Sequence, residues 1–214
     1  MFRVVIADDH PLFRDAIRLA LSDVGAGETM EIVDAASADE AKALADQHDD
    51  LDLLLLDLRM PGMNGLAGLI ELRRRHPALP IAVVSATDNP KIMRDCLDLG
   101  AMAYIPKSYD RRSIASAIED VLAGRMHLPE AAAGSAACID ADASLLESVR
   151  TLTPQQLRVL QAIAEGKPNK IIAHELGIAV KTVKAHVTVI LRKLGVTNRT
   201  QAVLAASRIV ASED

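Results

Sequence analysis

Aspartates follow two apolar runs in the amino-terminal half of the chain. Asp8 and Asp9 come after Phe2–Ala7, and Asp57 comes after Leu51–Leu56. If these runs are neighbouring parallel strands, their carboxyl ends bring three carboxylates to one edge of a sheet. Carboxylates that close repel one another, so they need a cation or a raised pKa. Such oxygen ligands suit Mg²⁺, and a carboxylate beside Mg²⁺ can attack a phosphoryl group to give an aspartyl phosphate.

Two more polar groups follow later apolar runs. Ser85 ends the fourth run and Lys107 follows the fifth. A transferring phosphoryl group needs positive and hydrogen-bonding partners, so Lys107 is expected to pair with its oxygens and Ser85 to donate a hydrogen bond. Tyr104 is expected to report the change by swinging inward, and Thr87 competes with Ser85 for the hydroxyl role. Each residue taken singly is more often a cap or a solvated group, but four strand ends together favour a site.

The elements that must position these groups alternate between strands and helices. Five apolar runs are separated by segments with helical periodicity over about the first 124 residues, as expected for an α/β domain with a doubly wound parallel sheet of order 2-1-3-4-5. The predicted strands are Phe2–Ala7, Glu31–Ala36, Leu51–Leu56, Ile81–Ser85 and Ala101–Pro106.

The rest of the chain is predicted to be all-helical. Residues 125–148 are rich in Ala, Gly and Ser and are interpreted as a linker. The predicted domains are therefore an α/β domain at 1–124, the linker at 125–148 and a four-helix domain at 149–214. The predicted helices are Pro154–Glu165, Pro168–Leu176, Val180–Leu194 and Asn198–Ala211.

The net charge of −5 hides two halves of opposite sign. The segment from Ser148 onward contains ten Lys/Arg and four Asp/Glu, which gives it a net charge of about +6. The segment before Ser148 contains 14 Lys/Arg and 25 Asp/Glu, which gives it a net charge of about −11. The basic half is a nucleic-acid candidate. No apolar run is long enough to cross a membrane. The two cysteines, Cys96 and Cys138, lie far apart in the sequence, so a disulfide framework is not expected. This cysteine usage predicts that the protein works in the reducing cytoplasm.

Residues 168–194 have the pattern of a helix-turn-helix, with a turn at Gly177–Val180. The first residues of the second helix in such a motif meet base edges in a major groove. The expected base-contacting residues are Lys181, Thr182, Lys184 and Thr188, and the expected phosphate-contacting residues are Lys167, Asn169, Lys170, Arg192, Lys193 and Arg199. The alternative is an amphipathic bundle whose lysines only solvate its surface.

Four motifs resemble the receiver domain of a bacterial response regulator. They are DDHP at 8–11, LLDLRMPGMNG at 55–65, VVSA at 83–86 and AYIPKS at 103–108. The resemblance implies that Asp57 accepts phosphate from a sensor histidine kinase. It also implies that Asp9 and Asp57, with Asp8 partly through water and the backbone carbonyl of Arg59, hold Mg²⁺.

Residues 151–206 resemble the DNA-binding domain of the LuxR/NarL class, with Thr188 where basic residues are common in that class. Together the two resemblances imply a phosphorylation-controlled transcriptional regulator of the NarL/LuxR class rather than a stand-alone enzyme. Its expected partners are a sensor histidine kinase and double-stranded promoter DNA. Phosphorylation is expected to favour a homodimer and to free helices that the unphosphorylated receiver masks.

Three other functions are compatible with parts of this sequence. A haloacid-dehalogenase-like phosphatase also uses a strand-end aspartate, but it needs a second Asp two residues later, where this chain has Arg59. A small-molecule sensor on a LuxR-type DNA binder has no need for the combined aspartates and lysine. A regulator that is never phosphorylated and is controlled by protein partners keeps the fold but not the switch.

Overall fold

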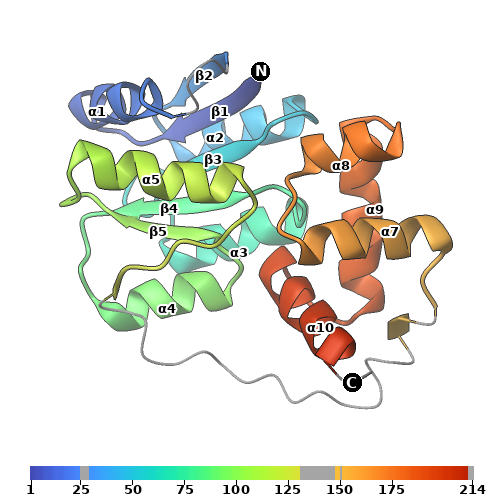
Figure 1. Ribbon diagram of the computed structural model, residues 1–214. Helices are drawn as coiled ribbons and strands as arrows, with labels where there is room; N and C mark the ends of the chain where they lie inside the picture. Colours follow the sequence, from blue (N-terminus) through green and yellow to red (C-terminus); the bar gives the residue numbers. More distant parts are fainter. Residues whose placement is uncertain (25–28, 131–147, 150, 212–214) are drawn as a thin grey trace.

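A five-stranded parallel sheet forms the centre of the amino-terminal domain (Figure 1). The computed structural model describes residues 1–24, 29–130, 148–149 and 151–211, with side chains described up to 206. The strands are β1 Phe2–Ala7, β2 Met30–Ala35, β3 Leu53–Asp57, β4 Ile81–Ser85 and β5 Ala103–Pro106. Their order in the sheet, β2-β1-β3-β4-β5, confirms the predicted order.

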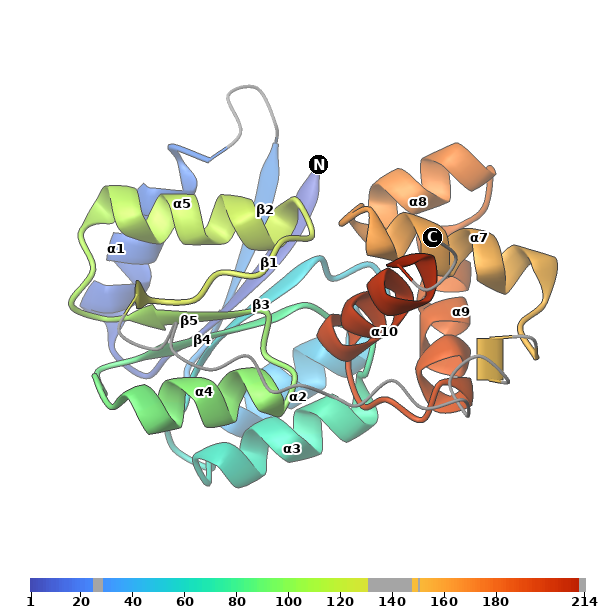
Figure 2. The same ribbon diagram turned by 60° about the horizontal axis from the view of Figure 1, so that its bottom comes forward.

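Helices cover both faces of this sheet (Figures 1 and 2). Alternate strand residues point to opposite faces, so Val4 and Leu55 pack with α1 and α5, whereas Val5 and Leu54 pack with α2, α3 and α4. Strands buried on both sides explain why the sequence shows continuous apolar runs. The helices are α1 Pro11–Leu21, α2 Ala38–Gln47, α3 Leu66–Arg75, α4 Pro90–Asp98 and α5 Arg111–Leu122.

Local signals set the helix starts. The Ser37 side chain accepts a hydrogen bond from the amide of Glu40 at the start of α2, and Glu40 in turn accepts one from the amide of Ala36. Asn89 and Asp110 cap α4 and α5 in the same way.

The third strand differs from its predicted bounds, since β3 begins at Leu53 and includes Asp57. The segment before it is held in a turn, where the Asp52 carboxylate accepts a hydrogen bond from the amide of Arg3.

Four helices form the carboxyl-terminal domain around their own core, which includes Val159, Ile163, Ile172, Val187 and Ile190. The helices are α7 Pro154–Ala164, α8 Asn169–Leu176, α9 Val180–Lys193 and α10 Arg199–Ala211. A complete capping box begins α7, in which the side chains of Thr153 and Gln156 bond each other's backbone amides.

This helical domain packs against the loops that precede the strands (Figures 1 and 2). Ala78, in the loop before β4, belongs to the core of the helical domain. Gly124, just after α5, lies so close to Gly166 that a Cβ at Gly124 would fall onto the carbonyl oxygen of Gly166. We call the contacts between the two domains the domain interface. It lies at the amino ends of the strands, opposite the edge at which their carboxyl ends place Asp8 and Asp57.

Cys96 is a free, buried thiol, and burial raises its pKa to about 12. The other cysteine, Cys138, lies outside the described residues.

Truncation of a central core residue tests the sheet. Leu55→Ala should lower the free energy of unfolding by about 3 kcal/mol, because the leucine is 1% exposed and its loss leaves a cavity. The matched control is Leu19→Ala on α1, where the leucine is 56% exposed. Urea denaturation followed by circular dichroism compares the two. Equal loss in both variants would contradict the assigned burial.

Candidate functional site

The carboxyl ends of β1, β3 and β5 bring Asp8, Asp57 and Lys107 together. The Lys107 ammonium lies 2.6 Å from Asp8 Oδ2 and 2.8 Å from Asp57 Oδ2. Both aspartates are almost fully buried, at 1% and 2% exposure. Burial lowers the pKa of Lys107, but hydrogen bonds to Asp57 and Asp8 outweigh it, so the pKa is raised overall. The lysine is therefore charged at neutral pH and offsets two buried carboxylates.

The second oxygen of Asp57 accepts a hydrogen bond from the amide of Arg59 at 2.9 Å. The Arg59 guanidinium reaches over to the next strand end and donates to Thr87 Oγ1 at 2.9 Å. Arg59 thus binds Asp57 through its backbone and Thr87 through its side chain.

Four side chains offer atoms that could hold a metal ion. One ligand atom each from Asp8, Asp9, His10 and Asp57 lies within 4.8 Å of the other three. Asp9 Oδ1 is a buried oxygen with no hydrogen-bond partner in the described part of the chain. Asp8 Oδ2 lies 2.6 Å from the Lys107 ammonium. A group of carboxylates in which one buried oxygen, Asp9 Oδ1, receives no hydrogen bond from the described residues fits a hard divalent cation such as Mg²⁺.

Ser85 and Tyr104 lie beside this cluster. Ser85 is buried at the end of β4, and its hydroxyl accepts a hydrogen bond from the amide of Thr87 at 3.3 Å. The Tyr104 ring is fully buried, and its hydroxyl donates to the carbonyl of Thr87 at 2.7 Å. Burial raises the pKa of Tyr104, against a hydrogen bond with Ser85 that lowers it. Tyr104 is thus turned inward in this structure, and its expected swing in response to phosphorylation stays a prediction.

The backbone of Tyr104 contacts the start of the segment that leaves the receiver. Its amide donates to the carbonyl of His127 at 3.3 Å, and the amide of His127 donates to Met102 at 3.0 Å. His127 also pairs with Asp120 through its side chain at 3.0 Å. The chain after α5 thus runs along the edge of β5, next to Tyr104.

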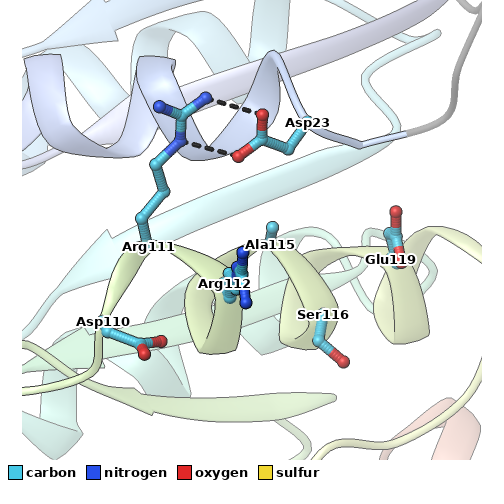
Figure 3. A pocket seen from close by; sticks show the side chains of 7 residues that line it. All are labelled: Asp23, Asp110, Arg111, Arg112, Ala115, Ser116 and Glu119. Atoms are coloured by element: carbon cyan, nitrogen blue, oxygen red, sulfur yellow. Dashed lines mark hydrogen bonds and ion pairs between the residues drawn. The ribbon is translucent and has the colours of Figure 1, made fainter.

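A hollow of about 740 Å³ lies elsewhere, against α5 and the end of α1 (Figure 3). Arg111 crosses it to form two hydrogen bonds of 2.6 Å with Asp23. The other lining side chains are Asp110, Arg112, Ala115, Ser116 and Glu119. In this hollow Arg111 and Asp23 already form hydrogen bonds with each other. The hollow also lies on a different part of the receiver from Asp57. We therefore assign the chemistry to the acidic cluster instead.

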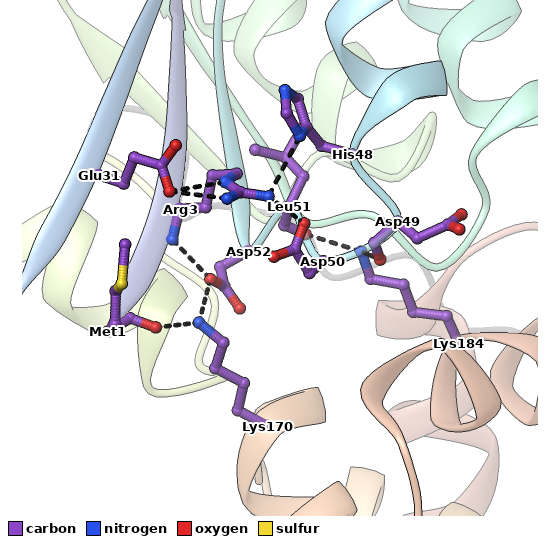
Figure 4. Close-up of polar contacts among 10 residues, drawn as sticks. All are labelled: Met1, Arg3, Glu31, His48, Asp49, Asp50, Leu51, Asp52, Lys170 and Lys184. Carbon is purple, nitrogen blue, oxygen red and sulfur yellow. Dashed lines mark hydrogen bonds and ion pairs between the residues drawn. The ribbon is translucent and has the colours of Figure 1, made fainter.

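Lysines predicted to bind DNA are held by an acidic loop of the receiver, residues 49–52 (Figure 4). Lys170 pairs with Asp52 at 2.5 Å and also donates to the carbonyl of Met1. Lys184 donates to the carbonyls of Asp49 and Leu51, at 2.6 and 2.8 Å. Burial lowers the pKa of the Lys184 ammonium, although nearby aspartates partly oppose this. These contacts lie at the domain interface.

Lys181 also reaches this loop. It pairs with the carboxylate of Asp49, and this hydrogen bond lowers the pKa of Asp49. Thr188 bonds the carbonyl of Lys184 within its own helix. Thr182 and Arg192 are exposed.

Other predicted phosphate contacts take part in internal structure. Asn169 and Arg199, at 8% and 6% exposure, are buried in this arrangement of the domains, and their contact with DNA phosphates stays a prediction. Arg199 donates to Asn169 and to the carbonyl of Lys167, and Asn169 approaches the Ala78 carbonyl at 3.4 Å. Burial lowers the pKa of Arg199 to about 10. Lys167 pairs with glutamates, and Lys193 bonds backbone and side-chain oxygens at the start of α7.

Some residues of these sites were not singled out from the sequence. His10 joins the acidic cluster, and the only sequence signal was its position directly after two aspartates. Asp49 and Asp52 pair with two of the lysines that were predicted to bind DNA. The run of acidic residues before the third strand is visible in the sequence, but no partner was predicted for it.

Comparison with known proteins matches both halves of the chain. Residues 4–119 match the family described as "Response regulator receiver domain", and residues 150–206 match "Bacterial regulatory proteins, luxR family". The chain is 44% identical over 215 residues to the glycerol metabolism activator of Pseudomonas putida, covering 98% of this chain and 96% of that protein. It is 35% identical over 201 residues to the nitrate/nitrite response regulator protein NarL of Escherichia coli K12, covering 93% and 92%.

A solved structure titled "Structure of two RcsB dimers bound to two parallel DNAs" is also similar, with a TM-score of 0.55 and 27% identity, covering 96% of this chain and 98% of that one. The family matches thus confirm both resemblances found in the sequence, the receiver domain and the LuxR-type domain. The strand order of the sheet agrees with them. The chain belongs to the response regulators that join a receiver domain to a LuxR-type DNA-binding domain, and it is a DNA-binding transcriptional regulator of that family.

Proposed function

We propose that Asp57 is the phosphoacceptor and that a sensor histidine kinase is its donor. The observation that carries the proposal is the position of the Lys107 ammonium between Asp8 and Asp57. An oxygen of Asp57 forms a bond to phosphorus as the bond between phosphorus and the donor breaks. Lys107 then balances charge on the phosphoryl oxygens, and Ser85 lies on the neighbouring strand end to donate a hydrogen bond.

Asp8, Asp9 and Asp57, with the carbonyl of Arg59, would hold Mg²⁺, which when bound neutralises charge on the phosphoryl oxygens. The protein residues orient Asp57 and limit the charge repulsion. Arg59 cannot act as the second acid of a haloacid-dehalogenase-like phosphatase, because its guanidinium stays protonated. The cluster therefore suits acceptance of a phosphoryl group better than turnover of phosphate esters.

We further propose that the acidic loop masks the DNA-binding surface until Asp57 is phosphorylated. Asp49 and Asp52 present carboxylates to Lys181 and Lys170, as DNA phosphates would. Lys184 is held by carbonyls instead of a carboxylate, so the cost of its burial is only partly offset. An interface that holds a poorly compensated charge can open reversibly.

The phosphorylated form is proposed to separate its domains, dimerise and place two helices in successive major grooves of promoter DNA. Tyr104 offers a physical connection, because its backbone bonds the segment that leads toward the linker. None of the helices in the described ranges has the length and apolarity needed to cross a bilayer. Because a bacterial regulator must reach promoter DNA, we propose that this protein works in the cytoplasm. We also propose that the receiver ends at residue 124 and that the linker ends at residue 148.

Removal of the acceptor tests the switch. Asp57→Ala should abolish labelling by acetyl phosphate and the rise in DNA affinity that the donor causes. Fluorescence anisotropy with promoter fragments, with and without acetyl phosphate and Mg²⁺, measures both proteins at one salt concentration. The control is Asp95→Ala, which removes an aspartate on α4, away from the acidic cluster, and should be labelled as the wild type is. A rise in affinity that persists in Asp57→Ala would overturn the assignment.

A glycine pair allows the masking to be tested without touching either binding site. Gly124→Ala should force the domains apart, because its Cβ would overlap the carbonyl oxygen of Gly166. Gly166→Ala is the matched control: both glycines have positive φ, +82° and +80°, but a Cβ at Gly166 meets nothing within 4 Å. The backbone strain is thus similar, about 1 kcal/mol, in both variants.

The expected result is that Gly124→Ala binds promoter DNA without a phosphodonor and has a larger radius of gyration in small-angle X-ray scattering. Gly166→Ala should behave as the wild type in both assays. Identical DNA affinity and size for the two variants would refute masking by the domain interface.

Lys184 is expected to read bases once released. In the phosphorylated protein, Lys184→Ala should weaken specific DNA binding by roughly tenfold and change the preferred bases, as loss of a base contact does. Selection from a random DNA pool measures both. Lys42→Ala, on the receiver surface, should leave the selected sequences and affinity as they are. An unchanged base profile in Lys184→Ala would remove it from the recognition surface.

A further inference from the structure

Arg14, on α1, holds the turn between β1 and α1 through the backbone of Asp8. The paired residues of β1 end at Ala7, so the Asp8 carbonyl lies beyond the ladder of the sheet. Arg14 Nη1 donates a hydrogen bond of 2.6 Å to this carbonyl oxygen. The Asp8 amide, in turn, donates to the carbonyl of Ala35 at 3.0 Å. The backbone of Asp8 is therefore fixed by β2 through its amide and by α1 through its carbonyl.

The carbonyl that Arg14 binds belongs to the peptide group between Asp8 and Asp9. A peptide group is planar, so a hydrogen bond to its oxygen fixes the orientation of the plane that joins the two Cα atoms. Both aspartate side chains leave the backbone from these Cα atoms, and both belong to the acidic cluster. One guanidinium thus sets the direction of two carboxylates.

The guanidinium is itself anchored outside the acidic cluster. Arg14 Nε donates to Asp34 Oδ2 at 3.2 Å, and Asp34 lies on β2. The Arg14 side chain is only 16% exposed. A planar guanidinium with two such contacts has a defined orientation. Arg14 therefore connects β2 and α1 to the turn that carries Asp8 and Asp9.

Pairing with Asp34 alone does not account for Arg14. The other oxygen of this carboxylate already pairs with Arg18 at 2.7 Å. The contact of Arg14 with Asp34 is longer, at 3.2 Å, than its bond to the Asp8 carbonyl, at 2.6 Å. The two arginines share one carboxylate, whereas the hydrogen bond to the Asp8 carbonyl comes from Arg14.

We propose that Arg14 is a positioning residue of the phosphorylation site, which holds the Asp8–Asp9 peptide so that both carboxylates face the cation. This rests on the proposed function of the site. Without Arg14 the peptide plane can rotate, and the two carboxylates lose their common direction. Groups that orient metal ligands from outside contribute about 10- to 100-fold to the affinity for the metal. Arg14 therefore determines how tightly the receiver binds its cation.

Nuclear magnetic resonance of the full chain, without any cation, tests the peptide directly. The Asp9 amide belongs to the peptide that Arg14 holds. Its ¹⁵N relaxation dispersion should be flat in the wild type and show exchange in Arg14→Met. Arg18→Met is the matched control, because it removes the other cation that pairs with Asp34. The Asp9 amide of this control should behave as in the wild type.

Titration of the same variants with Mn²⁺, used as the probe of the cation site, tests the consequence. The affinity, measured from the electron paramagnetic resonance of the free ion, should fall about tenfold in Arg14→Met and stay unchanged in Arg18→Met. Arg14→Lys keeps a charged donor without the planar fork, so it should have an intermediate affinity. Urea denaturation shows whether each variant is folded, and Arg14→Lys serves as the test if Arg14→Met is not.

Two results would overturn the role of Arg14. One is a flat Asp9 profile together with wild-type Mn²⁺ affinity in Arg14→Met. The other is an equal loss in Arg14→Met and Arg18→Met, which would assign the effect to the pairing with Asp34. Failure of acetyl phosphate to label Asp57 in the wild type would instead refute the proposed function, whereas the relaxation of the Asp9 amide would still decide what Arg14 does.

Discussion

Two buried carboxylates that share one ammonium define this molecule. Asp8 and Asp57 are shielded from water by the sheet and its helices, and Lys107 lies between them. Removal of one partner from such a set leaves an uncompensated buried charge, which costs several kcal/mol. Three strands must end at the same edge to make this arrangement, so the sheet order and the site depend on each other. The same requirement for positive charge makes the site suited to a phosphoryl group.

The DNA-binding helices meet the receiver at the other end of the strands. Strands of four to six residues span roughly 13–20 Å, so a change at Asp57 must cross the sheet to reach Lys170 and Lys184. Close packing lets a sheet and its helices shift as units. The chain after α5 is bonded along β5 beside Tyr104, and Gly124 contacts Gly166 directly before that segment. Tyr104, the proposed switch residue, and the domain interface are thus joined by a short stretch of chain.

The balance of charges at the interface favours weak closure. Lys170 and Lys181 meet carboxylates, but the ammonium of Lys184 meets only carbonyl oxygens, and its burial lowers its pKa. Because docking favours the neutral lysine, the closed form gains stability as pH rises through the lowered pKa toward the ordinary value. At neutral pH the charged lysine therefore opposes closure of the domain interface.

Much of the fold followed from local patterns. Continuous apolar runs predicted β1 to β5, and strand-end aspartates with Lys107 predicted the cluster, because both depend on short-range sequence signals and on the rule that parallel strands end together. The burial of Asn169 and Arg199 was not predictable in this way. It depends on how two separately folded domains meet, and neither periodicity nor charge along one helix contains that information. The acidic loop at 49–52 was visible, but its partners lie more than a hundred residues away.

The central claim, that a phosphoryl group at Asp57 releases lysines at the far end of the sheet, is tested most directly by their chemical accessibility. Amine-reactive labelling followed by mass spectrometry gives the modification rate of Lys170 and Lys184, with phosphoramidate as the donor and Lys42 as the internal reference. We predict that both lysines are labelled slowly without the donor and much faster with it, and that Asp57→Ala shows no acceleration. Unchanged labelling of Lys170 and Lys184 in protein whose Asp57 is demonstrably phosphorylated would contradict the claim.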